Sequence, residues 1–158
     1  MKLCKNDIID YYYNSYVKAD GLWFIKVEEK YGFDKALELD NEVWKILPKI
    51  QARFLKDRLG LKEGIESLYE CLEAKLELDS FNYNISKAGE SLEVMIFRCP
   101  WHNLMQKSGR ESLSGKIGSL ICNTEYSVLA KEFGTDIKLK ISERICHGSS
   151  KCKLTFTS

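Results

Sequence analysis

The spacing of apolar residues changes once along this chain, near position 78, and that change limits the fold more than any other feature. Before it, apolar side chains recur at helical intervals, as in the stripe from Leu39 to Phe54. After it, FNYNIS and SLEVMIFRC show the alternation and the β-branched content of strands. Helices followed by strand pairs are typical of α+β proteins, so the sequence predicts N-terminal helices packed on an antiparallel sheet.

The helical part is expected over about residues 1–78. Helices are predicted over residues 6–20, 20–32, 33–59 and 65–76. Asp20 is the expected N-cap of the second helix, and Gly32 is its expected stop. Pro48 should kink or divide the third helix, because proline removes a backbone hydrogen bond and clashes with the preceding turn.

The α+β part, about residues 79–158, is expected to contain two hairpins with a helix between them. KAGE is the predicted turn of the first hairpin, and the strands TDIKLKISERI and KCKLTFT form the second. Between the hairpins, SLICNTEYSVLAKEFG is predicted to be a helix that stops at Gly134. The chain has 158 residues and no linker or repeat, so we expect a single domain over residues 1–158.

Charge and composition exclude several classes of function. The net charge is +1 with both signs interspersed, which argues against nucleic acid as a partner. No apolar stretch approaches the ~20 residues of a membrane span, and MKLCKNDIID lacks the apolar core of a signal peptide. We therefore expect a cytoplasmic protein with no membrane partner. Its six cysteines should be reduced there, and available as metal ligands, reactive thiols or core residues.

The last strands bring metal-competent groups together. Period two continues the inner face of DIKLKISERIC onto Glu143, and it places Cys152 on the inner face of the final strand. Cys146 lies where the strand breaks, and Cys122 opens the apolar stripe of the helix. Three thiols and a carboxylate can supply four tetrahedral zinc ligands. The alternatives are separate core cysteines with Glu143 in solvent, or Glu125 as a rival carboxylate.

A second cluster, RCPWH, places Cys99 three residues before His102. The pair could act as a nucleophile and its base, or supply alternative zinc ligands. The simpler interpretation is a core cysteine and a surface histidine. His147, beside Cys146, is expected to be solvent-exposed, and Cys4 and Cys71 have no companions in sequence.

These residues resemble the 4-vinyl reductase domain family. The shared pattern is a cysteine ahead of a helix, a strand closing with Glu-x-x-Cys, a glycine-containing loop and a last cysteine. In this sequence those positions are Cys122, Glu143, Cys146, Gly148 and Cys152. The resemblance implies that the three cysteines and the glutamate bind zinc. It also implies a homodimer and a fold similar to TRAPP subunits and haem-NO-binding domains.

With the resemblance added, we expect a zinc-containing domain that binds a small apolar or aromatic ligand. The metal would tie the last helix to the final hairpin. A first alternative is an enzyme, a reductase or hydrolase of a small molecule, acting through Cys99 and His102 or through an open zinc position. A second alternative is a TRAPP-like protein-interaction scaffold.

Overall fold

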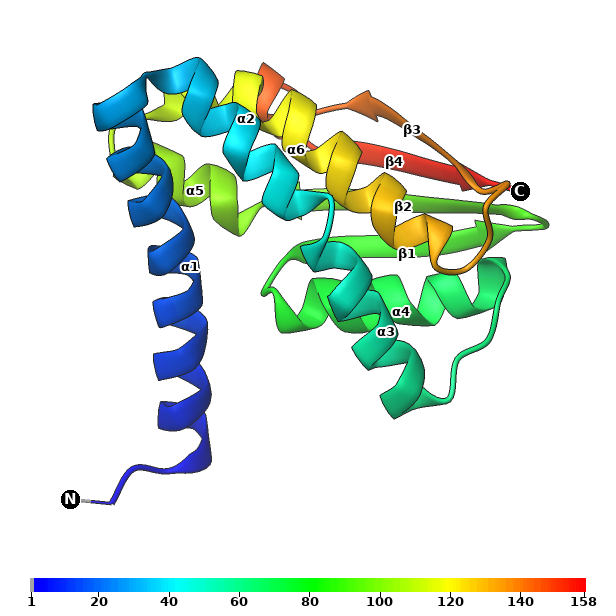
Figure 1. Cartoon of the computed structure of the whole chain (residues 1–158). Helices are drawn as coiled ribbons and strands as arrows, with labels where there is room; N and C mark the ends of the chain where they lie inside the picture. The colour runs from blue at the N-terminus through cyan, green and yellow to red at the C-terminus, as the bar shows by residue number, and fades with distance from the viewer. Residues whose placement is uncertain (1) are drawn as a thin grey trace. The chain divides into compact units, whose positions relative to one another are not determined.

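A computed structural model describes residues 2–158 (Figure 1). The chain divides into two compact units, one ending at Glu42 and the other running from Val43 to Ser158. Each unit is described by itself. The larger unit contains the sheet and the residues that the sequence singles out for chemistry.

The first unit is built on one long helix. Helix α1 spans Lys5–Tyr31, and α2 follows at Phe33–Trp44. The predicted division of α1 at Asp20 is wrong: the helix continues through Gly21, because a glycine in a helix costs only about 1 kcal/mol relative to alanine. Gly32 does end α1. Its φ of 88° breaks the helix, and its amide donates to the Glu28 carbonyl at 2.8 Å.

Pro48 divides the next helical stretch, as predicted. Helix α2 ends at Trp44, and α3 spans Leu47–Leu59 with the proline in its first turn. A proline is tolerated there because the first helical amides have no partner within the helix. Helix α4, Ile65–Leu78, then completes the helical part.

A four-stranded antiparallel sheet follows, with strand order β1-β2-β4-β3. The strands are β1 (Asn82–Ala88), β2 (Ser91–Arg98), β3 (Lys138–Glu143) and β4 (Cys152–Thr157). Two helices, α5 (Pro100–Lys107) and α6 (Glu111–Lys131), lie between the hairpins, and the 3-10 turn η1 (Ile145–His147) joins β3 to β4. The expected α+β class and antiparallel sheet are confirmed.

One hydrophobic core fills the larger unit. Helices α4 and α6 pack on the sheet, and α3 contacts both of them (Figure 1). The inner face of β2 carries Leu92, Val94 and Ile96, which are all buried. Phe97 lies on the opposite face of the strand and is 48% exposed. VMIF is apolar at consecutive positions, so alternation alone cannot show which face of that strand is buried.

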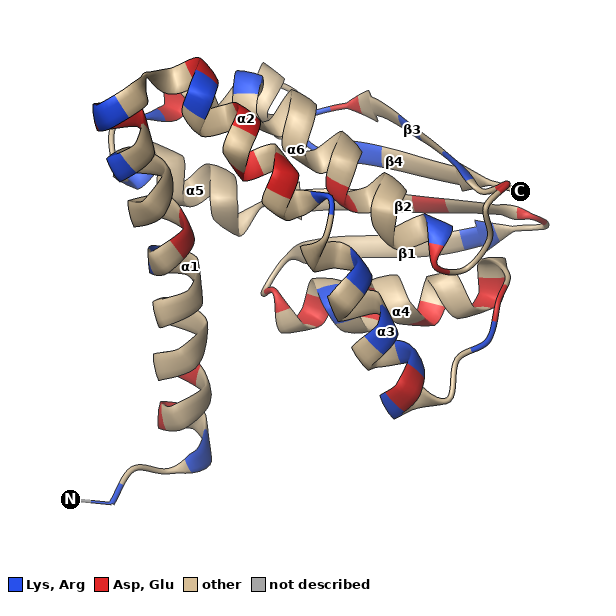
Figure 2. Ribbon diagram, viewed as in Figure 1, with Lys and Arg blue, Asp and Glu red and all other residues tan. Residues whose placement is uncertain are grey.

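The surface carries mixed charge. Helix α3 carries mainly basic residues, α4 mainly acidic ones, and both signs occur on the strands (Figure 2). Within residues 2–158, no helix combines the length and apolar character needed to cross a membrane.

Candidate thiol-rich site

Two glycines of α6 form the seat for the turn η1. A Cβ atom added at Gly118 would lie 2.9 Å from Sγ of Cys146 and 3.9 Å from Sγ of Cys122. A Cβ at Gly115 would lie 3.0 Å from the Cys146 carbonyl oxygen. Larger side chains at these positions would therefore push the turn away. The missing Cβ of Gly118 brings the thiols of α6 and η1 together.

Hydrogen bonds hold the η1 turn against Gly115 and Gly118 of α6. Arg144 donates from Nη1 to the Gly118 carbonyl at 3.0 Å and from Nη2 to Oδ1 of Asn123 at 3.1 Å. Nε2 of His147 lies 3.1 Å from the Gly115 carbonyl oxygen and 2.9 Å from Oγ of Ser119. Because a carbonyl only accepts, Nε2 carries the proton. His147 is exposed as expected, yet its ring helps to dock the turn.

The third predicted thiol, Cys152, begins β4 beside the same turn. The amide of Ile145 donates to Sγ of Cys152 at 3.3 Å. Cys152 and Cys122 both pack against the hydrophobic core, and each interacts electrostatically with Cys146. The structure thus brings the three predicted cysteines to one corner of the larger unit, where α6, η1 and β4 meet.

Cys99 belongs to the same corner. It directly follows β2 and is the N-cap residue of α5. Its side chain packs against the same core as Cys122 and Cys152. A thiolate on Cys152 would raise the pKa of Cys99, and a thiolate on Cys99 would raise the pKa of Cys122. Burial raises the pKa of Cys99 to about 12, although the amides of His102 and Trp101 favour the thiolate. Without a metal this cysteine is a protonated thiol at neutral pH.

The other three thiols are also protonated without a metal. Burial raises the pKa of Cys122 well above its ordinary value, and the carboxylate of Glu125 adds to the effect. Burial likewise raises the pKa values of Cys146 and Cys152, and the positive charge of the Arg144 guanidinium partly offsets this rise. None of the four thiols has the depressed pKa of an activated nucleophile.

Glu143 keeps the alternating burial of β3 and is partly buried like Leu139 and Ile141, but it lies out of register with Cys152. The register of β3 and β4 shifts between Ile141 and Glu143, so that Glu143 lies opposite Lys153. Lys153 pairs with Glu93 at 2.6 Å, and both the hydrogen bond and the charge of Glu93 raise its pKa, with a smaller contribution from Glu143.

The rival carboxylate, Glu125, is committed to an ion pair inside the protein. Nζ of Lys75 lies 2.9 Å from Oε1 of Glu125 and 2.6 Å from Oδ2 of Asp79. Both Lys75 and Glu125 are buried. Burial alone would lower the pKa of Lys75, but the two carboxylates outweigh it and raise that pKa. Lys75 therefore remains charged and holds Glu125 in place.

His102 is oriented toward partners on α6. Its Nδ1 lies 2.8 Å from Oγ of Ser114, and its Nε2 lies 3.8 Å from Oε1 of Glu111. Both ring nitrogens thus point toward α6. The backbone amide of His102, and not its ring, donates a hydrogen bond that favours the thiolate of Cys99. The ring is not positioned to deprotonate Cys99.

Within residues 2–158, no three or more His, Cys, Asp or Glu side chains are grouped so that they could hold a metal ion as they stand. The donor set nonetheless fits zinc, because thiolates are ligands that zinc prefers and four cysteines border one corner. The Gly118 cradle also leaves room for Sγ of Cys146 beside Cys122.

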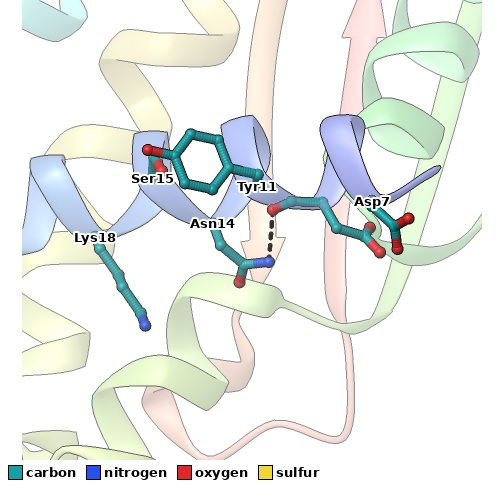
Figure 3. Close-up of a pocket in the computed structure, with 6 residues that line it drawn as sticks. Asp7, Tyr11, Asn14, Ser15 and Lys18 are labelled. Carbon is teal, nitrogen blue, oxygen red and sulfur yellow. Dashed lines mark hydrogen bonds between the residues drawn. The ribbon is translucent and has the colours of Figure 1, made fainter. Parts of the chain in front are cut away.

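A separate hollow lies on α1 in the smaller unit. It has a volume of about 390 Å³ and is lined by Asp7, Asp10, Tyr11, Asn14, Ser15 and Lys18 (Figure 3). Nδ2 of Asn14 donates to the Asp10 carbonyl at 2.7 Å, which is a contact within the helix. All six lining residues come from one helix and most are polar, so this hollow does not resemble the apolar pocket that the sequence predicts.

Sequence reasoning missed the two glycines that seat η1. Gly115 and Gly118 lie three residues apart, so they share one face of α6, and Ser119 and Asn123 continue that face. A pair of small residues at this spacing ahead of Cys122 was the available signal.

The fold and the thiol-rich corner define an α+β protein in which four of the six cysteines lie at the end of its sheet. The chain belongs to a family of unknown function (DUF6125), whose model matches residues 2–155. No curated protein matches the chain.

Proposed function

We propose that this protein is a zinc-binding domain whose metal ties α6 to the turn and strand at the end of the chain. The observation that supports the proposal is that Cys122 and Cys146 meet at Gly118, while Cys152 accepts the amide of Ile145 in the same turn. The resemblance to the 4-vinyl reductase domain family predicts the same three ligands, together with Glu143.

Zinc would change the protonation of this corner. The four thiols are protonated without a metal, and zinc binding displaces their protons because only the thiolate is a ligand. The ligand side chains then turn toward the ion by rotation about χ1. The proposal also requires reduced thiols, which agrees with the cytoplasmic location that we propose.

The test is zinc content, measured by mass spectrometry on protein purified without added metal. Wild type should carry about one zinc ion per chain, and Cys146→Ser should carry far less. Cys4→Ser is the matched control, because Cys4 is exposed and lies in the other unit. A wild type without zinc, even after it is incubated with the metal under reducing conditions, would contradict the proposal.

We further propose that a small apolar or aromatic ligand binds near the thiol-rich corner. The aromatic side chains there support this part. Trp101 follows Cys99 by two residues and meets Trp44 edge to face, with ring centroids 6.1 Å apart. Phe97 and Leu104 expose apolar surface on either side of that segment.

Calorimetric titration with p-cresol tests the ligand proposal. Trp101→Ala should weaken binding several-fold, because an aromatic pair contributes about 0.5–1.5 kcal/mol beyond the area it buries. Cys99→Ala should leave the affinity nearly unchanged. The absence of any heat of binding for a series of small aromatic compounds would contradict this part and leave the zinc proposal standing.

A further inference from the structure

We infer that the fourth zinc ligand is the thiolate of Cys99 in place of Glu143. This inference rests on the zinc-binding function proposed above. It changes the expected site from three thiolates and a carboxylate to four thiolates, and it adds the segment between β2 and α5 to the elements that the metal ties together.

The first argument is that Glu143 lies out of register with Cys152. The shift in register after Ile141 places Glu143 opposite Lys153, whose ammonium binds Glu93 at 2.6 Å and also interacts with the Glu143 carboxylate. The thiol of Cys152 instead accepts a hydrogen bond from the amide of Ile145 and packs against the core. A carboxylate that is out of register with Cys152 and lies beside a lysine is a weaker candidate ligand than a thiol that packs against the same core as Cys122 and Cys152.

The second argument is that the other nearby carboxylate is unavailable. Glu125 lies one turn beyond Cys122 on α6, which would suit a ligand. However, its Oε1 lies 2.9 Å from Nζ of Lys75. Moving Glu125 to a metal would leave a buried ammonium with one partner fewer, which is unfavourable because a desolvated charge depends on its partners.

The third argument is the position of Cys99 itself. β2 pairs with β4, and Ile96 lies opposite Cys152. Cys99 follows three residues later, at the end of the sheet where Cys152 begins β4. It packs against the same core as Cys122 and Cys152, and it lies close enough that a thiolate on Cys152 would raise the pKa of Cys99 and a thiolate on Cys99 would raise the pKa of Cys122. Cys99 is therefore the remaining soft ligand at this corner.

A nearby cation fits a four-thiolate ion. Zinc with four thiolates carries a net charge of −2, which is costly to bury without a counter-charge. The positive charge of the Arg144 guanidinium favours the thiolate forms of Cys122, Cys146 and Cys152. Two hydrogen bonds to α6 hold the guanidinium in place. When zinc binds, the four thiols lose four protons to solvent and no electron is transferred. Such a site is closed, with no position for a catalytic water.

The test compares Cys99→Ser with Glu143→Gln and with Cys4→Ser as the control. Serine is a favourable N-cap residue, so Cys99→Ser should preserve α5. In competition with a chelator, Cys99→Ser should weaken zinc binding by more than the roughly 10- to 100-fold loss that removing a supporting residue causes. Glu143→Gln should change the affinity by no more than a few-fold. In the cobalt-loaded protein, Cys99→Ser should lower thiolate charge-transfer absorption by roughly one quarter, because three thiolates replace four.

The possible outcomes separate this inference from the zinc proposal. Zinc binding that survives in Cys99→Ser and is lost in Glu143→Gln would overturn the inference and support the three-thiolate site. Zinc binding that is unchanged in both variants would overturn the inference as well. A wild type that binds no zinc would overturn the zinc proposal itself. Circular dichroism of each variant confirms that a lost metal reflects a lost ligand and not a lost fold.

Discussion

At the scale of single residues, the interior holds a charge network that the sequence alone did not indicate. Lys75 is buried between Glu125 and Asp79, and its stem lies among core leucines of α4. Buried charges persist only when they are paired, because desolvation costs several kcal/mol for each ion. Here the pairing has a further consequence, since it keeps Glu125 away from the neighbouring thiol of Cys122.

Lys75→Met should lower the free energy of unfolding by about 3–5 kcal/mol at neutral pH, because it strands the Glu125 carboxylate. Lys87→Met is the control: Lys87 pairs with Glu66 at the surface, where such a pair contributes about 0–1 kcal/mol. Urea denaturation measures both variants. Equal losses in the two would contradict the assigned role of Lys75.

The same variant should show a diagnostic pH dependence. Burial raises the pKa of Glu125 above its ordinary value, and without the Lys75 ammonium nothing offsets that effect. The folded state then binds a proton more tightly than the unfolded state. Stability in Lys75→Met should therefore rise as the pH falls from 7 toward 5, and be lost again as the pH rises. A stability that falls over that range would contradict the assignment.

At the scale of elements, α6 begins earlier than its apolar stripe indicates. The helix starts at Glu111, eight residues ahead of the predicted segment, and it includes Gly115 and Gly118. Each glycine in a helix costs about 1 kcal/mol relative to alanine. Packing of the η1 turn against these two positions compensates, because the turn approaches closely only where Cβ is missing.

Gly118→Ala should therefore destabilise the protein by about 1–3 kcal/mol, since its Cβ would meet Sγ of Cys146 at 2.9 Å. The control is Gly21→Ala on α1, where nothing lies within 4 Å of the new atom, and a gain of about 0.4–1 kcal/mol is expected. Thermal or urea unfolding checks the signs. A gain in stability at both positions would show that the turn does not depend on the glycine seat.

At the scale of the whole molecule, the hydrophobic core and the thiol-rich corner both belong to the larger unit. Every member of the core cluster lies between Ala52 and Phe156. The long helix of the smaller unit instead exposes apolar side chains, among them Ile9, Tyr11 and Tyr12, with Tyr12 at 68% exposure. We propose that this helix is the contact of a homodimer, because a soluble protein rarely leaves a large apolar patch uncovered.

The fragment 43–158 should therefore fold but fail to dimerise. Circular dichroism should show a cooperative transition, since the core is retained, and sedimentation equilibrium should show a monomer. The full chain should sediment as a dimer, and Tyr12→Glu should weaken it. A dimeric fragment would move the contact to the larger unit, and a monomeric full chain would contradict the dimer itself.

By itself, the sequence determined the fold class, most helices and strands, the break at Pro48 and the stop at Gly32. These depend on local periodicity and backbone restrictions, which are written in neighbouring residues. It also indicated that Cys122 and Cys152 face the core, against which both pack. Local alternation was sufficient there, because each residue lies in or beside an element with one buried face.

Tertiary structure decided the rest. A single shift in register placed Glu143 opposite Lys153 and out of register with Cys152, and alternation within one strand cannot reveal such a shift. The choice between Cys99 and Glu143 depends on which strands are neighbours, and the order β1-β2-β4-β3 sets this at long range. Lys75 and Glu125 lie fifty positions apart in sequence, and only packing of α4 beside α6 unites them. Local patterns fix the direction of a side chain, whereas its partners are fixed by how the elements pack.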